Sequence, residues 1–240
     1  MENKNFQVHF DCGSSKIRAA AFDKHNIEKS FYHESNFFNN HENIVTEIQK
    51  IISALEEDTK EYINDINLII DSHQMLSVGI SVSKKIDGSK VEKKDIQFLI
   101  QDAKKQVLRN YSIYNIIHII IKSYKIDNIE YKSLPDNKNC NLISLDIIFI
   151  CLSKKVIEYF KKQFFKLDIS INQISCSSYA KSTNYKENFS NIENLSFIDI
   201  GLNKTSILCY NKNEIISLDV LPIGGNHITK DISKILKLNL

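Results

Sequence analysis

The chain has 240 residues, 42% of them apolar, and its 31 lysines and arginines nearly balance its 29 aspartates and glutamates. This length is enough for one large domain or two small ones with a packed core. The balanced charge creates no field that would attract nucleic acid or a membrane surface, so no nucleic-acid partner is expected.

The five cysteines are scattered singly, without a C-x-x-C pair. This spacing predicts buried free thiols in a reducing compartment rather than disulfides or a metal site. No segment approaches the roughly 18 continuous apolar residues that a membrane-spanning helix needs, and the N-terminus has no apolar signal core. A cytoplasmic protein is therefore expected.

In chain order, a β-hairpin over residues 6–23 comes first, followed by an extended piece over 31–43. Apolar residues at helical spacing predict helices over residues 44–55, 96–107 and 156–164, and a fourth that starts at 177. Apolar runs predict strands over residues 66–70, 76–82, 116–121, 126–131, 142–152 and 169–176. A turn over residues 134–139 and a polar linker over 184–194 complete the pattern.

The strand over residues 142–152 is the most apolar of the chain, which predicts a central position covered on both faces. Helix, strand and helix follow it, and this alternation is typical of a parallel sheet. The expected fold class is therefore α/β.

One short sequence pattern occurs twice in the chain. Residues 10–24 match residues 198–212 after a shift of 188 positions. The matched residues are Asp11 with Asp199, Gly13 with Gly201, and Lys16 with Lys204. Each copy reads as strand, Asp-x-Gly turn, polar pair and second strand, which predicts a β-hairpin.

The two turns are suited to binding phosphate. Glycine lets a backbone N–H come close to a ligand oxygen, so Gly13 with the hydroxyls of Ser14 and Ser15 can form an anion-binding nest. The second turn offers Gly201 and the hydroxyl of Thr205. Lys16 and Lys204 are further candidate phosphate-binding residues.

The aspartate before each glycine has a different predicted role. Asp11 and Asp199 would repel phosphate, and they are better suited to holding Mg²⁺ through its water shell. Two such hairpins facing each other would clamp a nucleotide from both sides.

A third signal is the strand end Leu221–Pro222–Ile223–Gly224–Gly225, which runs into a predicted helix. This places free backbone N–H groups and the positive end of a helix beside the second hairpin. Gly224 and Gly225 are therefore added to the candidate phosphate-binding residues.

Together these motifs resemble a known family. The hairpins look like phosphate motifs 1 and 2 of the actin, Hsp70 and sugar-kinase superfamily. Within it, Val78–Ser83 and Leu221–Ile232 resemble the bacterial cell-division protein FtsA. The resemblance extends over essentially the whole chain but covers only the first half of a typical FtsA.

The resemblance implies an actin-like (ribonuclease H-like) subdomain 1A over residues 1–76 and 142–190. It implies an inserted strand-helix-strand-strand (SHS2-type) subdomain 1C over 77–141, so that the strand over 142–152 is where the chain re-enters 1A. Residues 195–240 would be the incomplete start of subdomain 2A, which makes a truncated or partial protein the expectation.

The resemblance also implies ATP with Mg²⁺ between the lobes and self-association through the actin-like lobes. It implies a link from the ring protein FtsZ to the cytoplasmic face of the inner membrane at the septum. Membrane contact is expected only through a C-terminal amphipathic helix that has no counterpart here. No catalytic residue is assigned, and any ATPase activity is expected to be weak.

One departure from the family concerns the second turn, where Leu202 and Asn203 replace glycines and cannot approach phosphate as closely. Lys204 could supply a compensating charge, but weak or absent ATP binding is expected. Two alternatives are a type IV pilus inner-membrane adaptor that resembles FtsA, and a kinase of the same superfamily. In a kinase, Asp11 and Asp199 would position Mg²⁺ for phosphoryl transfer, yet no substrate pocket or catalytic base is apparent in the sequence.

Overall fold

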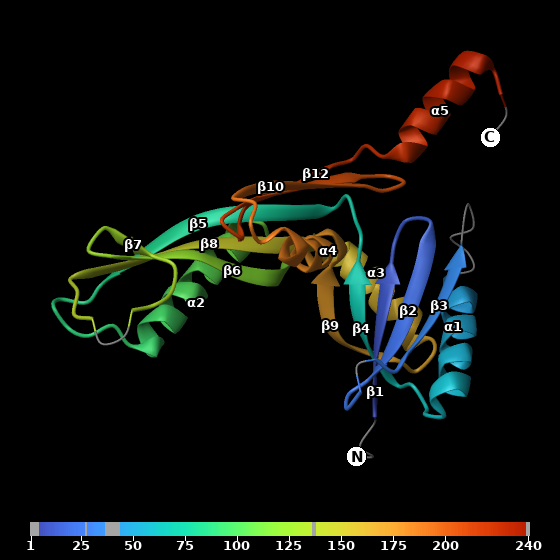
Figure 1. Ribbon diagram of the computed structural model, residues 1–240, viewed down its shortest axis with the longest axis horizontal. Coiled ribbons are helices and arrows are strands. Elements are labelled where there is room, and N and C mark those ends of the chain that lie inside the picture. Colours follow the sequence, from blue (N-terminus) through green and yellow to red (C-terminus); the bar gives the residue numbers. More distant parts are fainter. Residues whose placement is uncertain (1–4, 27, 37–43, 136–137, 239–240) are drawn as a thin grey trace.

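The computed structural model describes residues 5–26, 28–36, 44–135 and 138–238. Its strands form three separate sheets (Figure 1). The strands are β1 (Phe6–Cys12), β2 (Lys16–Asp23), β3 (Ser30–Asn36), β4 (Asp65–Ile70), β5 (Met75–Lys85), β6 (Tyr114–Ile126), β7 (Ile129–Tyr131), β8 (Leu142–Ser153), β9 (Ser170–Cys176), β10 (Asn194–Ile200), β11 (Thr205–Asn211) and β12 (Glu214–Leu221). The helices are α1 (Ile44–Thr59), α2 (Lys93–Asn110), α3 (Lys154–Phe165), α4 (Ser177–Lys186) and α5 (Gly225–Leu236).

The first sheet has the strand order β3-β2-β1-β4-β9. β1 pairs antiparallel with β2 and parallel with β4, and β4 pairs parallel with β9. The apolar stripe of α1 is buried, as its spacing predicts, and α1 packs on β2 and β3. α3 lies on the same core, where the ring of Phe164 meets that of Phe10 edge-on with centroids 5.3 Å apart. The expected extended piece is β3 in its first part, and its residues 37–43 lie outside the described residues.

The second sheet, with the order β5-β8-β6-β7, is antiparallel throughout. α2 packs against it and buries its predicted apolar face. β6 is one strand from Tyr114 to Ile126, where the sequence predicted a shorter strand over 116–121 and a new one starting at 126. β6 and β7 are joined at Asp127 and Asn128, whose φ angles of 48° and 68° suit a tight hairpin turn.

β8 is the strand whose position differs most from the prediction. It lies between β5 and β6 and is antiparallel to both, instead of returning to the first sheet. Ile148, Ile150 and Leu152 belong to the core of the first sheet, while Ile147 and Phe149 belong to the core under α2. The apolar run therefore reflects a strand packed between two cores, and the antiparallel sheet extends to Ser153, beyond the predicted boundary at residue 141.

The third sheet, β10-β11-β12, is an antiparallel meander. One of its faces is packed into the core of the first sheet through Leu208, Tyr210 and Leu218. The predicted linker over 184–194 is instead the end of α4 and a 3-10 turn at Glu187–Phe189, followed by the start of β10. α5 leads away from the sheet (Figure 1), and none of the helices in the described ranges is long and apolar enough to cross a membrane.

The two predicted hairpins have the same backbone geometry. In the first, the Gly13 N–H donates to the Lys16 carbonyl at 3.0 Å, and in the second the Gly201 N–H donates to the Lys204 carbonyl at 2.8 Å. The strand registers also match, since Asp11 lies opposite Arg18 and Asp199 opposite Ser206. The repeat in the sequence is thus a repeat in the structure.

Candidate functional site

A cavity of about 440 Å³ lies between the two repeated hairpins. Gly13 and Ser14 line it from the first turn, Asn203 from the second, and Lys155 from α3. The loop that follows β4, residues 71–74, forms a further wall. The volume is within the range of small-molecule sites in proteins.

The first turn has unused hydrogen-bond donors. The backbone N–H groups of Ser14 and Ser15 make no hydrogen bond among the described residues, because Gly13 alone closes the turn. These donors suit an anion, as the sequence predicted. Lys16 is engaged elsewhere, with its Nζ 2.7 Å from Oε1 of Glu34 on β3.

Asp11 is a partly buried carboxylate on the opposite face of β1 from the core residue Phe10. Its Oδ2 lies 3.4 Å from a guanidinium nitrogen of Arg18. Its Oδ1 is buried and accepts no hydrogen bond from the described residues. Burial raises the pKa of the Asp11 carboxyl, and the positive charges of Lys181 and Arg18 oppose that rise.

Lys181 of α4 connects the two repeats. Its Nζ lies 3.3 Å from Oδ2 of Asp199, and it is the charge that most lowers the pKa of Asp11. The hydroxyl of Ser177, one helical turn earlier, also lowers the pKa of Asp11. Sequence reasoning missed both residues, although a helix starting at 177 places positions 177 and 181 on one face.

Lys204 differs from its predicted role. Its Nζ lies 2.6 Å from Oδ1 of Asp71 and donates a hydrogen bond to the hydroxyl of Ser206, and its side chain is only 2% exposed. A lysine this deeply buried needs a compensating anion. Asp71, which directly follows β4, supplies it, so Lys204 ties the second hairpin to the loop after β4 instead of facing a phosphate. In the sequence, Asp71 is a single aspartate after a predicted strand, and no pattern there indicates that it pairs with Lys204.

The Gly-Gly helix start lies against the second turn, but its N–H groups are not free. Gly225 donates to the Gly201 carbonyl at 2.9 Å, and Asn226 donates to the Leu202 carbonyl at 2.9 Å. A Cβ at position 224 would lie 2.4 Å from the Gly201 carbonyl oxygen. Gly224 is therefore required for close packing of α5 on the turn, and the helix start does not present the free donors that the sequence suggested.

The predicted phosphate-binding and metal-binding residues thus fall into two groups. Gly13, Ser14 and Ser15 lie in the turn that has unused donors. The others have protein partners for the groups that were expected to bind a ligand, and they are Asp11, Lys16, Asp199, Gly201, Lys204, Thr205, Gly224 and Gly225. Thr205, for example, donates its hydroxyl to the Ile223 carbonyl at 2.7 Å.

The donor set does not fit a Mg²⁺ site. Mg²⁺ needs a near-octahedral set of oxygen ligands, whereas cations lie 2.6 to 3.4 Å from the local carboxylates. The pairs are Arg18 with Asp11, Lys181 with Asp199, and Lys204 with Asp71. Only Oδ1 of Asp11 is left as an unpaired buried oxygen of the two predicted ligands. Across the described residues, no group of three or more His, Cys, Asp or Glu side chains could hold a metal ion.

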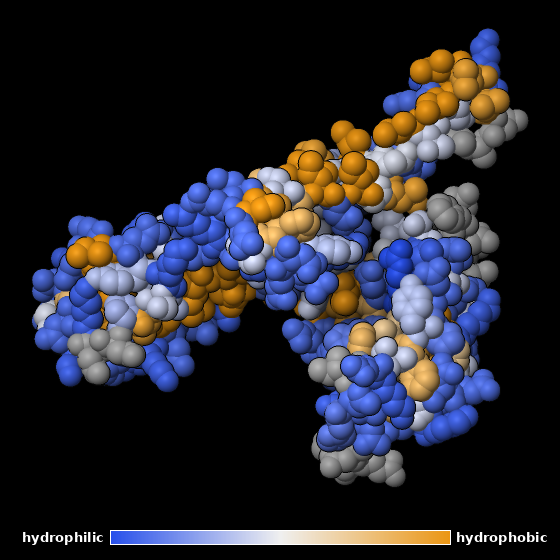
Figure 2. All heavy atoms as spheres, in the orientation of Figure 1, coloured by the Kyte–Doolittle hydropathy of each residue, from blue (hydrophilic) through white to orange (hydrophobic). Residues whose placement is uncertain are grey.

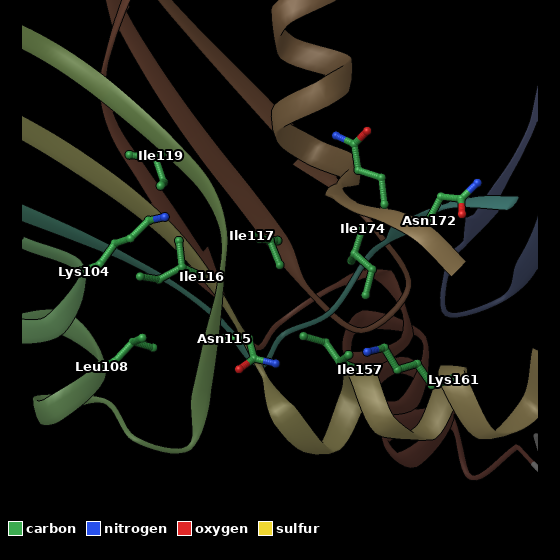
Figure 3. Close-up of a pocket in the computed structure, with 11 residues that line it drawn as sticks. Lys104, Leu108, Asn115, Ile116, Ile117, Ile119, Ile157, Lys161, Asn172 and Ile174 are labelled. Atoms are coloured by element: carbon green, nitrogen blue, oxygen red, sulfur yellow. The ribbon is translucent and has the colours of Figure 1, made fainter. Parts of the chain in front are cut away.

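A second cavity, of about 550 Å³, lies between β6 and α2 on one side and α3 and β9 on the other (Figure 3). Lys104 of α2 and Lys161 of α3 stand on opposite sides of it, and isoleucines such as Ile116 and Ile174 line the space between them. None of the predicted site residues lines this cavity.

Comparison with known proteins points to one family. The model of the family "Cell division protein FtsA" matches residues 196–240, which contain the second hairpin and α5. The FtsA of Buchnera aphidicola subsp. Schizaphis graminum is 25% identical over 201 residues, which cover 79% of this chain and 46% of that relative. The FtsA of Buchnera aphidicola subsp. Baizongia pistaciae is 25% identical over 218 residues, which cover 88% and 50%. The chain spans about half the length of the curated relatives it matches.

Among solved structures, the chain is similar to the PilM–PilN type IV pilus biogenesis complex. The TM-score is 0.70 at 9% identity, with 97% of this chain and 66% of that chain covered. At such low identity the likeness shows the fold alone. The resemblance to FtsA and the α/β, actin-like fold that the sequence predicted are confirmed.

Proposed function

We propose that the chain belongs to an FtsA-type cell-division protein, a scaffold that helps assemble the division ring and links FtsZ to the cytoplasmic face of the inner membrane. The observation that carries this proposal is the FtsA match over residues 196–240. The matched segment contains Lys204 and Gly224, two residues whose contacts join the second hairpin to its neighbours. The matched segment thus includes the contacts that join the second hairpin to the loop after β4 and to the start of α5.

The three sheets support a division into subdomains. In this proposal the first sheet with α1, α3 and α4 is subdomain 1A. The antiparallel sheet from β5 to β8, with α2, is the inserted subdomain 1C, and β10 to α5 begin subdomain 2A. The boundary between 1C and 1A then falls at Ser153, where β8 ends and α3 begins.

The cavity between the hairpins is the proposed nucleotide cleft. The unused N–H groups of Ser14 and Ser15 would hold a phosphate, and Lys155 at the cavity wall adds a positive charge. The second turn contributes less, since Leu202 and Asn203 carry side chains where a close approach needs glycine. This asymmetry supports weak ATP binding and a role in assembly rather than catalysis.

The test of the division role is co-purification from cells that produce the tagged chain. Enrichment of FtsZ supports the proposal. Enrichment of pilus inner-membrane proteins without FtsZ would favour the adaptor alternative, for which the fold shared with the PilM–PilN complex is the supporting observation. Lys212→Ser, which removes an exposed ion pair with Glu193, is a suitable control and should leave the co-purification unchanged.

A further inference from the structure

α5 carries an apolar stripe that none of the described residues covers. The stripe recurs at helical spacing, its side chains are at least half exposed, and it consists of Ile228, Ile232, Ile235 and Leu236. α5 makes no extensive contact with any other helix or strand in the described ranges. A helix of 12 residues is marginal in water by itself, and β-branched isoleucines lower its propensity further. Stable formation of α5 therefore requires a surface that covers the stripe.

The outer face of the third sheet is a second apolar surface. Ile198 and Ile200 alternate along β10 with Phe197, which packs against the core of the first sheet. Leu221 of β12 lies in register with Ile200 across β11, and Ile223 follows it. All but Phe197 of these five side chains are exposed. Figure 2 shows apolar surface over the third sheet and along α5.

α5 does not cover the sheet of its own chain. Its first two N–H groups are bonded to backbone carbonyls of the second turn, and Nδ2 of Asn226 donates to Oδ1 of Asn203 at 3.2 Å. These bonds fix the start of the helix, which then leads away from the sheet (Figure 1). Rotation of α5 toward its own sheet would break them. The helix stripe and the sheet face are thus two complementary surfaces that one copy of the chain keeps apart.

We propose that a second copy of this chain covers both surfaces in a two-fold dimer, in which α5 of each copy packs on the third sheet of the other. Packing of an apolar helix stripe on an apolar sheet face is a standard way of building a core. A two-fold axis makes the contact reciprocal, so both stripes and both sheet faces are covered in a closed dimer. The dimer depends on neither the nucleotide cleft nor FtsZ.

The area of the two surfaces is sufficient for a dimer. The eight apolar side chains of the stripe and the sheet face are 46–77% exposed, and complete burial of an isoleucine or leucine side chain removes roughly 100 Å² from water. Each copy therefore buries roughly 500 Å² of apolar side-chain surface in the dimer. Because about two thirds of a homodimer interface is apolar, the two copies together bury roughly 1,500 Å². Specific protein interfaces bury about 1,200–2,000 Å².

The experiment measures the oligomeric state of the purified chain by sedimentation velocity at protein concentrations from about 1 to 200 µM. The wild type is compared with Ile232→Lys on α5 and Ile198→Glu on β10. Ile129→Glu is the matched control, because Ile129 is 58% exposed on β7 of the second sheet. Circular dichroism checks that each variant is folded, which is expected because all three side chains are at least half exposed.

We expect the wild type and Ile129→Glu to dimerise with a dissociation constant in the micromolar range. Ile232→Lys and Ile198→Glu should each raise this constant more than about tenfold, because the dimer would bury a charge without a partner. An equimolar mixture of these two variants should form a heterodimer. One of its two helix-sheet contacts is unaltered, and the other brings the lysine and the glutamate together.

A wild-type chain that stays monomeric at the highest concentration would overturn the proposal, and so would a dimer that neither interface variant weakens. A mixture of the two variants that stays monomeric would show that α5 of one copy does not pack on the sheet of the other. A different protein retained in equal amount by the purified chain would replace the second copy as the occupant. None of these results depends on FtsZ, so failure here is distinct from failure of the division role.

Discussion

Replacing Lys204 by methionine would remove the positive charge of a buried ion pair while keeping an apolar side chain of similar length. The Lys204 ammonium lies 2.6 Å from Oδ1 of Asp71, and the two side chains are 2% and 13% exposed. Leaving one partner of a buried pair uncompensated costs about 3–5 kcal/mol. Because Asp71 keeps some contact with water, the lower end applies, about 3 kcal/mol, which corresponds to a fall in the unfolding midpoint of about 6–12 °C.

The assay is a double-mutant cycle with Lys204→Met, Asp71→Asn and the double variant, measured by urea unfolding. The double variant should be more stable than Lys204→Met alone, since no unpaired charge remains in it. Lys212→Met, which breaks the exposed pair with Glu193, should change stability by less than about 0.5 kcal/mol. Additive effects of the two substitutions, with a coupling energy near zero, would refute the view that this ion pair joins the second hairpin to the loop after β4.

Three further predictions concern other parts of the molecule. Gly224→Ala should destabilise the protein by more than about 2 kcal/mol, because its Cβ would meet a backbone carbonyl at 2.4 Å. Gly79→Ala, with no atom within 4 Å of the added carbon, should not destabilise it, and equal losses in urea unfolding would contradict the packing argument. Burial lowers the pKa of His118, whose Nε2 accepts the Cys176 N–H at 3.0 Å. The unfolded chain therefore binds more protons, so the unfolding free energy should fall from about pH 7 to pH 5. His118→Gln should reduce that fall, and an unchanged slope would assign it to other groups. Ellman's reagent should modify Cys209 first in the native protein, because it is the one cysteine of the five that is not buried. Simultaneous reaction of all five would show that the core opens as a whole.

Local patterns predicted most of the secondary structure. The apolar stripe of α1 and the hairpin turns at Gly13 and Gly201 were read correctly, because both depend on residues close in sequence. β8 was misplaced for the opposite reason. A long apolar run shows that both faces are covered but not by which elements, and here two separate cores cover it. Its pairing with β5 and β6 depends on contacts across the chain that no local pattern contains.

The candidate site shows the same limit at the level of side chains. The repeat predicted the hairpin positions of Asp11 and Asp199, but it did not predict the ion pair that Asp199 forms with Lys181, which lies on another element. Lys204 was expected to face a phosphate because it follows the Asp-x-Gly turn at Gly201, which is typical of a phosphate-binding hairpin. The partner that fixes it, Asp71, is far away in the chain and close only in the fold.

The two repeats share a backbone but differ in their surroundings. Phe10 and Cys12 of β1 are almost fully buried, whereas the equivalent residues of β10, Ile198 and Ile200, are 63% and 66% exposed. Figure 2 shows the apolar surface that results over the third sheet and α5. The difference follows from the helices, since α1 lies over its own hairpin while α5, fixed at Gly224 to the second turn, leads away from its sheet. Equal sequence patterns therefore form equal turns, and the side chains around each turn decide which cation its aspartate meets, which is Arg18 for Asp11 and Lys181 for Asp199.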